Sequence, residues 1–332
     1  MRDRLVLGID TSNYTTSAAL CGADGEILLN SRIPLEVREG ERGLRQSDAV
    51  FLHSKNLPAA AKEVREALLR LPGSKIAAVA VSYAPRDHEG SYMPCFLAGV
   101  SAAEMAASAL SVPVMYYSHQ AGHIMAAAAS ACSVGGTDVR DFLKNEFMAF
   151  HVSGGTTDVL LCRPADSSFR NRMGTRVPFT IEKIGGTFDI NCGQAIDRAG
   201  VMMGMHFPCG AELDRLACEF TGKISGVKLS VKGIGFNMSG LENKAEDLYS
   251  RNGDKAEVSA YVLSWISDTL EKITENAFHI YGRLPIVYSG GVMSSRFIRK
   301  RLSGYGAFAA EGLSSDNACG TAQLGAFFGN TI

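Results

Sequence analysis

The sequence predicts an α/β protein built from two similar halves. Three observations predict it. Apolar strand-like segments alternate with helical segments along the chain, and one turn rich in glycine and hydroxyl residues occurs twice. The length of 332 residues, 46% of them hydrophobic, is enough for two domains with substantial cores.

The repeated turn belongs to a hairpin. Residues 5–20 are typical of an apolar strand, a polar turn and a returning strand, and residues 147–162 have the same pattern. In both segments the turn contains Ser or Gly, and Thr-Thr precedes the second strand. Two copies, one at the start of each half, indicate an internal duplication.

The remaining elements follow from apolar spacing. Apolar residues recur every 3.6 positions at 57–71 and at 258–273, which predicts two core-facing helices. Residues 96–117 are rich in Ala and Ser but contain Glu104 and Pro113, so they suit a buried helix and a strand better than a membrane span. Short apolar strands are expected at 76–82, 113–117 and 285–288.

Composition narrows the functional class. The 33 Lys and Arg balance 34 Asp and Glu, so no overall charge attracts nucleic acid and no DNA partner is expected. Residues 296–301 are a candidate basic patch for a polyanion, and a solvated cationic helix face explains these residues equally well. The eight Cys show no paired spacing, which favours reduced core thiols. Without a leader or membrane span, we expect a cytoplasmic protein.

A histidine pair suggests a metal site. His119 and His123 are four residues apart, so on a helix both imidazoles share a face and can reach one cation. Chance spacing is the alternative. Asp316 precedes a helix of small residues that runs toward Phe328, where it either caps the helix or completes a His-His-Asp site with an open coordination position.

Three glycine turns suit a nucleotide. Ser153-Gly154-Gly155 and Ser289-Gly290-Gly291 each follow a strand, and residues 207–210 form a third turn. Asp189 and Asp197, eight residues apart, would share a face if their segment is helical, and a carboxylate there can accept both hydroxyls of a ribose. Helix capping by Asp189 and a surface pair of Asp197 with Arg198 are the alternatives.

The duplication resembles the actin, hexokinase and Hsp70 (ASKHA) superfamily, in which two lobes flank a nucleotide cleft. Eight motifs, in order, also resemble the TsaD family of tRNA N6-adenosine threonylcarbamoyltransferases, formerly called O-sialoglycoprotein endopeptidases or glycoproteases. The motifs span residues 8–12, 119–123, 152–155, 193–198, 207–210, 238–242, 290–295 and 315–318.

The resemblance implies a set of sites and partners. It implies an iron (Fe²⁺) or zinc (Zn²⁺) ion on His119, His123 and Asp316. It also implies an adenine nucleotide (AMP, ATP or a carbamoyl-adenylate) at His151, Val152, Ser153, Gly154, Gly155, Asp197, Gly210, Gly290, Gly291 and Ser295. We therefore expect a transferase that moves a threonylcarbamoyl, or other carbamoyl, group from its adenylate to tRNA adenosine. Smaller TsaB- or TsaE-type subunits are expected as partners. The expected lobes are residues 1–118, with helix 317–332 packing back on them, and residues 119–316.

Several family residues differ here. Tyr14 and Thr15 stand where the family has an acidic pair, Ala121 and Gln194 replace two glutamates, and Ser295 replaces an asparagine. The chain therefore resembles a divergent paralogue. The alternative to the transferase is a catalytically altered paralogue that uses another acceptor or serves as a nucleotide-binding partner protein.

Overall fold

The computed structural model describes residues 3–12, 14–36, 44–224, 226–310, 312–314 and 317–329. The chain forms two compact units. Unit 1 contains residues 1–145, 164–180 and 316–332, and unit 2 contains residues 146–163 and 181–315. The first boundary therefore falls after residue 145, whereas we expected it after residue 118. The reason is that the helix starting at His119 packs against the C-terminal helix inside unit 1.

Unit 1 contains a five-stranded sheet in the order β3-β2-β1-β4-β5. The strands are β1 (Arg4–Asp10), β2 (Thr15–Gly22), β3 (Ile27–Pro34), β4 (Lys75–Ala84) and β5 (Val114–Ser118). β1, β2 and β3 are antiparallel, and β4 and β5 run parallel to β1. The predicted first hairpin is therefore confirmed as β1 and β2.

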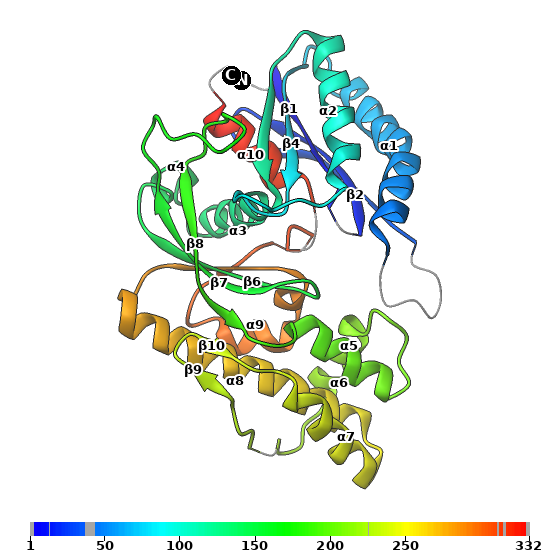
Figure 1. The fold of residues 1–332 in the computed structure, drawn as a ribbon, viewed down its shortest axis with the longest axis vertical. Coiled ribbons are helices and arrows are strands. Elements are labelled where there is room, and N and C mark those ends of the chain that lie inside the picture. Colours follow the sequence, from blue (N-terminus) through cyan, green and yellow to red (C-terminus); the bar gives the residue numbers. More distant parts are fainter. Residues whose placement is uncertain are drawn as a thin grey trace. The chain divides into compact units, whose positions relative to one another are not determined.

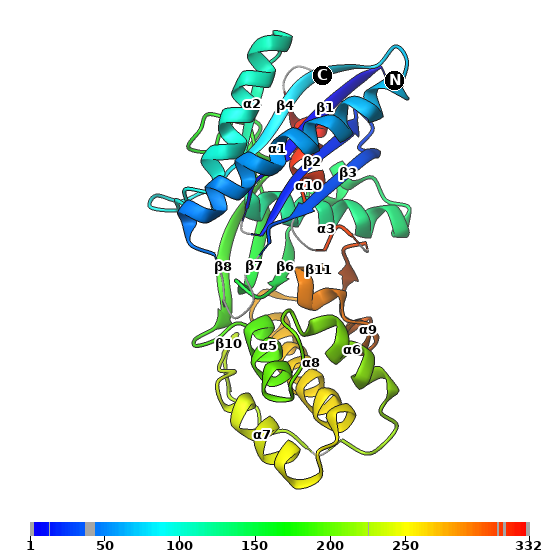
Figure 2. The ribbon, with the colours of Figure 1, turned by 90° about the vertical axis from the view of Figure 1, so that its right-hand side faces the viewer.

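Helices cover both faces of this sheet (Figures 1 and 2). α1 (Gln46–Leu69) and α2 (Phe96–Leu110) pack on one face, while α10 (Cys319–Phe328) packs on the other and also contacts α3 (His119–Gly135). A short helix, α4 (Val139–Phe142), follows α3. The close packing of α10 requires glycine at position 8, because a Cβ there would lie 2.6 Å from the Ala318 carbonyl oxygen.

Unit 2 contains a seven-stranded sheet in the order β12-β11-β6-β7-β8-β10-β9. The strands are β6 (Phe147–Val152), β7 (Thr157–Pro164), β8 (Phe179–Thr187), β9 (Val231–Lys232), β10 (Gly235–Phe236), β11 (Ile286–Ser289) and β12 (Ala307–Phe308). β6 and β7 form the second predicted hairpin, and β11 and β12 run parallel to β6.

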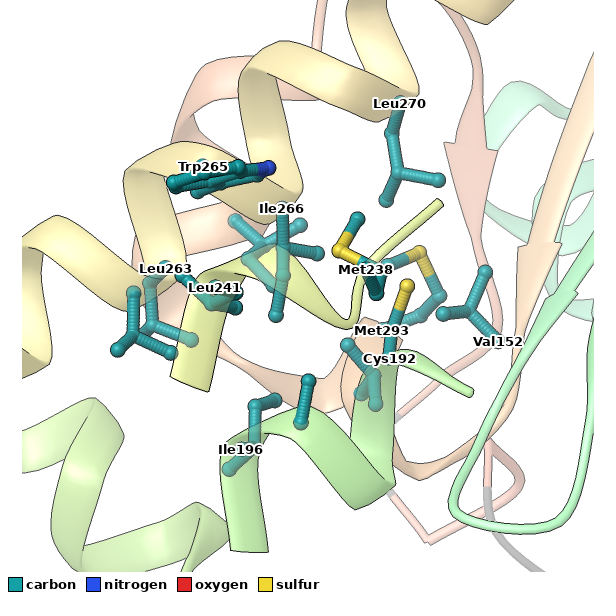
Figure 3. Packing of buried hydrophobic residues seen from close by; sticks show 14 of the residues in the cluster. Val152, Cys192, Ile196, Met238, Leu241, Leu263, Trp265, Ile266, Leu270 and Met293 are labelled. Carbon is teal, nitrogen blue, oxygen red and sulfur yellow. The ribbon is translucent and has the colours of Figure 1, made fainter. Parts of the chain in front are cut away.

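The helices of unit 2 enclose its core. They are α5 (Cys192–Met202), α6 (Gly210–Glu219), α7 (Gly240–Asn252), α8 (Lys255–Tyr281), the 3₁₀ turn η1 (Gly291–Ser294) and α9 (Arg296–Leu302). Figure 3 shows Val152, Cys192, Met238 and Ile266 meeting in this core. The helix predicted over 258–273 is confirmed as the central part of α8.

The two sheets confirm the predicted duplication. β8-β7-β6-β11-β12 repeats the order of β3-β2-β1-β4-β5, with an antiparallel hairpin and two parallel strands at the same places. All eight cysteines are free, and only Cys218 is exposed. Among the described helices, none combines the length and apolarity needed to cross a membrane.

Candidate functional site

Unit 2 contains a pocket of about 520 Å³. It lies where the turn between β6 and β7 meets the first turns of α5, α6 and α9 and a side chain of α8. Its lining residues are Gly154, Gly193, Ile196, Asp197, Pro208, Gly210, Ala211, Asp214, Leu263, Gly291, Val292, Ser294, Ser295 and Arg296. Its size suits a nucleoside or nucleotide, and it combines apolar walls with a few polar groups.

The β6–β7 turn and the start of α5 are packed backbone to backbone. The Gly193 N–H donates to the Ser153 carbonyl oxygen at 3.2 Å, and a Cβ on Gly193 would lie 2.6 Å from the Gly154 nitrogen. The hydroxyl of Thr157 accepts the N–H of Cys192 at 3.0 Å. The glycine turn therefore lies against a helix N-terminus, an arrangement that favours an anionic group.

Asp197 is the carboxylate that α5 places in the pocket. It accepts the N–H of Cys209 at 2.9 Å, and burial raises the pKa of its carboxyl although that bond opposes the rise. The alternative of a surface pair with Arg198 is wrong, because Arg198 pairs with Glu242. Asp197 therefore retains acceptor capacity for hydroxyl groups of a ligand.

Asp189 does not share a helix face with Asp197, so that expectation is wrong. α5 begins only at Cys192, and the Asp189 carboxylate accepts the N–H groups of Met238 and Ser239 at 2.8 and 2.9 Å. Although partial burial opposes ionisation, these backbone donors lower the pKa of Asp189 to about 2. Asp189 thus anchors the segment before α7.

Asp214 is a pocket residue that the sequence analysis missed. Its carboxylate accepts the hydroxyl of Ser295 and the N–H groups of Arg296 and Phe297, at 3.2 and 3.1 Å for the latter two. Its side chain is 12% exposed. Asp214 therefore fixes the first turn of α9 onto α6. Its position four residues after Gly210, one helical turn away, was the available signal.

The ten predicted nucleotide residues divide into two groups. Five line the pocket: Gly154, Asp197, Gly210, Gly291 and Ser295. The others, His151, Val152, Ser153, Gly155 and Gly290, are absent from its lining.

Four of these have structural contacts. Ser153 bonds to Thr156 within the β6–β7 turn. His151 is buried and its Nδ1 lies 3.1 Å from the Ser289 hydroxyl, while Val152 belongs to the core (Figure 3). Gly290 has a φ of 97° and a Cβ there would lie 2.2 Å from the Val152 carbonyl oxygen, so the chain requires glycine there.

The basic residues at 296–301 serve mainly internal contacts. Arg299 donates to the carbonyl oxygens of Met293 and Ala309 at 2.7 and 2.6 Å, and Arg301 pairs with Asp268. These bonds tie α9 to its neighbours, so Arg299 and Arg301 fit neither a polyanion patch nor the solvated helix face that was the alternative.

In unit 1, His119 and His123 share a face of α3, as their spacing predicts. Their Nε2 atoms lie 3.0 Å apart. Two nitrogens bound to one tetrahedral zinc ion at 2.0–2.1 Å are about 3.3 Å apart, so the pair fits two ligands of one ion. Within the described part of the chain, no three His, Cys, Asp or Glu side chains gather in a metal-binding arrangement.

Asp10 orients the first imidazole. Its Oδ2 lies 2.9 Å from the Nδ1 of His119, and Asp10 is fully buried. Burial opposes ionisation, but His119 and the hydroxyls of Ser12 and Ser82 lower the pKa of Asp10. An ionised Asp10 accepts a hydrogen bond from Nδ1–H, which favours the tautomer that has its lone pair on Nε2 of His119, as a metal ligand requires.

The expected third ligand, Asp316, lies outside the described residues. The described segment directly after it packs on α3, because a Cβ on Gly320 would lie 1.9 Å from the Gly122 carbonyl oxygen. Gly122 lies between the two histidines in sequence, so the start of α10 contacts the turn that carries them.

The structure shows the surroundings of the residues that differ from the family motifs. Gln194 accepts the N–H of Asn191 at 3.1 Å, a helix-capping contact that glutamine makes as well as glutamate. Ala121 is buried in the first turn of α3, so no carboxylate lies there. Tyr14 is exposed and Thr15 begins β2.

Solved structures resemble this chain in fold. Component A of the (R)-2-hydroxyglutaryl-CoA dehydratase of Acidaminococcus fermentans matches with a TM-score of 0.50 at 13% identity, covering 96% of each chain. Full-length HypF in its phosphate- and nucleotide-bound form matches with a TM-score of 0.54 at 13% identity, covering 97% of this chain and 55% of HypF. At these identities the likeness shows the fold alone, and it supports the ASKHA assignment.

Sequence relatives carry the family assignment. The tRNA N6-adenosine threonylcarbamoyltransferase of Streptococcus suis is 30% identical over 316 residues, which cover 91% of this chain and 84% of that protein. The Streptococcus pneumoniae protein of the same name is 28% identical with the same coverage. The family model described as TsaD, tRNA N6-adenosine threonylcarbamoyltransferase, matches residues 36–322. With both comparisons in agreement, this chain belongs to the TsaD family.

Proposed function

We propose that this protein is a metal-dependent, adenylate-binding transferase that moves a threonylcarbamoyl group from its adenylate to an adenosine of tRNA. The observation that carries the proposal is the match to the TsaD family over residues 36–322. The pocket of unit 2 and the histidine pair of unit 1 supply groups suited to this chemistry.

The pocket is proposed to hold the adenylate. Asp197 would accept hydroxyls of the ribose in addition to the Cys209 N–H that its carboxylate already accepts. Ile196, Leu263 and Val292 offer apolar contact to the base. The glycine turn at Gly154, beside the N-terminus of α5, would hold the phosphate that leaves with AMP.

The histidine pair is proposed to hold an iron or zinc ion together with Asp316. When bound, such an ion acts as a Lewis acid and as a template for the reacting group. Asp10 keeps the His119 ring in the required tautomer and orientation. Two neutral imidazoles and one carboxylate leave an open coordination position, and they do not distinguish iron from zinc.

Partner subunits of the TsaB or TsaE type form a further part of the proposal. Large apolar side chains are exposed on the two helices that cover one face of the unit 1 sheet: Phe51 and Leu69 on α1, and Leu97, Met105 and Leu110 on α2. Exposed apolar side chains on these two helices are groups that a partner subunit would bury. Removal of Phe51 and Met105 together should weaken assembly with such a subunit while AMP binding stays unchanged.

The reaction tests the proposal directly. The protein is incubated with ATP, threonine, bicarbonate, tRNA and the adenylate-forming partner, and the tRNA nucleosides are analysed. We expect modified adenosine from the wild type and at least a tenfold loss in Asp197→Asn. The control is Asp141→Asn, which removes an exposed carboxylate on α4 that lines neither pocket of unit 2. Tight AMP binding without product would favour the partner-protein or alternative-acceptor function instead.

Metal analysis tests the second site independently. We expect near-stoichiometric iron or zinc in the purified wild type and its loss in His119→Ala. His279→Ala, at an exposed histidine in the last turn of α8, is the matched control. Unchanged metal content in His119→Ala would remove His119 from the ligand set.

A further inference from the structure

A second pocket of unit 2 is basic and partly aromatic. It measures about 290 Å³ and lies between the extended segment before β9, one face of α7 and the first half of α8. We call it the basic pocket. It is lined by Gly226, Lys228, Lys244, Asp247, Leu248, Arg251, Tyr261 and Trp265, none of which lines the adenylate pocket.

Lys228 comes from a segment that presents only positive charge. Residues 220–241 contain three lysines and no Asp or Glu. Val227, Leu229 and Val231 pack against the core, while Lys228, Ser230 and Lys232 alternate with them and are exposed. The period-two pattern therefore directs the lysines away from the core.

The opposite wall is one face of α7. Lys244, Leu248 and Arg251 are spaced i, i+4 and i+7, so they lie along one side of the helix. The Nζ of Lys244 lies 3.8 Å from the Oδ2 of Asp247, and both side chains are 61% exposed. This ion pair therefore offsets little of the positive charge of the pocket. Three cations thus face one carboxylate in the pocket, which favours an anion.

The floor of the pocket is aromatic. Tyr261 and Trp265 lie one turn apart on α8, with ring centroids 5.9 Å apart in an edge-to-face arrangement. Figure 3 shows Trp265 projecting from α8 near Ile266. Trp265 is 6% exposed, and its Nε1 is a donor that meets no acceptor among the described residues. An indole N–H bonds readily to an anionic oxygen.

We propose that the basic pocket binds a phosphate group of an RNA backbone, so that it contacts the tRNA acceptor at a place outside the adenylate pocket. Lysine and arginine on a groove with aromatic rings are the groups that proteins use for single-stranded or looped RNA. The inference rests on the proposed function, since it assigns a contact surface for that acceptor.

Trp265 is the only tryptophan of the chain, so its fluorescence reports on this pocket. Unmodified tRNA transcript is titrated into the full-length protein, and inorganic phosphate and AMP are titrated separately. We expect a saturable change in Trp265 emission with tRNA and none with millimolar phosphate or AMP. An equal change with phosphate alone would identify a free-phosphate site and overturn the RNA assignment.

Two variants make the test quantitative. Lys228→Gln/Arg251→Gln removes two cations of the pocket, and Lys62→Gln/Arg65→Gln removes the same charge from exposed positions on α1. At 0.1 M salt we expect about tenfold weaker tRNA binding in the first variant. Its plot of log Kd against log salt should be shallower by about 1 to 2, since each lost phosphate contact contributes roughly 0.7–0.9. The control should match the wild type.

The outcomes separate the two proposals. AMP affinity measured in each variant shows whether unit 2 remains folded. Unchanged tRNA affinity and salt slope in Lys228→Gln/Arg251→Gln, or no tRNA binding by the wild type, overturn the basic-pocket assignment. Pocket-dependent tRNA binding without formation of modified adenosine overturns the proposed transferase and leaves the RNA site standing.

Discussion

Asp214 offers the most demanding prediction, because its effect follows from four contacts of one buried carboxylate. The Ser295 hydroxyl, two backbone N–H groups and, at 3.5 Å, the Arg296 Nε–H donate to it. Hydrogen bonds to a charged acceptor contribute roughly 1.5–3 kcal/mol each, and their effects do not add fully. We therefore expect Asp214→Ala to lower the free energy of unfolding by about 3 kcal/mol. Asp214→Asn, which keeps one acceptor oxygen, should cost about half of that.

The same substitution should weaken nucleotide binding. Asp214 holds Ser295 and the first turn of α9, and both contribute to the adenylate pocket. A displaced wall loses contacts worth about 1 kcal/mol, or roughly a fivefold higher Kd for AMP.

Urea unfolding and calorimetric titration of AMP measure the two effects. Glu212→Gln is the control, since Glu212 lies exposed two residues away on α6. If Asp214→Asn stays within about 0.5 kcal/mol of the control in stability and binds AMP with wild-type affinity, the assigned role of Asp214 is wrong.

Two further predictions concern other anchors of the fold. The Asp189 carboxylate, with its pKa lowered from 3.8 to about 2, contributes stability above pH 4 that is lost as the pH falls toward 2. Because the group is mostly exposed, about 1 kcal/mol of the roughly 2 kcal/mol that the pKa shift alone implies should remain, and Asp189→Asn should remove this part of the acid sensitivity in unfolding curves from pH 5 to pH 2. Gly320→Ala would place a Cβ 1.9 Å from the Gly122 carbonyl oxygen, so we expect about 2 kcal/mol of destabilisation and reduced metal content. Gly135→Ala on α3, where a Cβ meets nothing within 4 Å, should be neutral or stabilising, and equal behaviour of the two variants would contradict the packing argument.

Local pattern predicted most of the fold. The two hairpins and the long helices carry strong period-two or 3.6-residue signals, and the structure confirms them as β1–β2, β6–β7, α1 and α8. The boundary between the units was harder to predict. It depends on α10 packing against α3 nearly two hundred residues away in sequence, and no local pattern reports such a contact.

The candidate site was predictable only where its residues lie on one helix or turn. His119 and His123 lie on one helix, so their spacing alone places their Nε2 atoms together. Asp214 acts on Ser295 from another helix, 81 positions earlier, and its spacing from Gly210 places it near the pocket but does not reveal this contact. Asp189 looked like a helical partner of Asp197, but its carboxylate binds backbone groups of a distant segment instead.

Transfer from preformed threonylcarbamoyl-adenylate to tRNA is the most direct measurement of the central claim. The adenylate is supplied in a single turnover, so no adenylate-forming enzyme is needed, and the tRNA nucleosides are read by mass spectrometry. We predict threonylcarbamoyl-adenosine and one AMP per group transferred with the wild type, and little of either with Asp197→Asn. Hydrolysis of the adenylate without any modified adenosine, from a protein that holds its metal and binds AMP, would contradict the account.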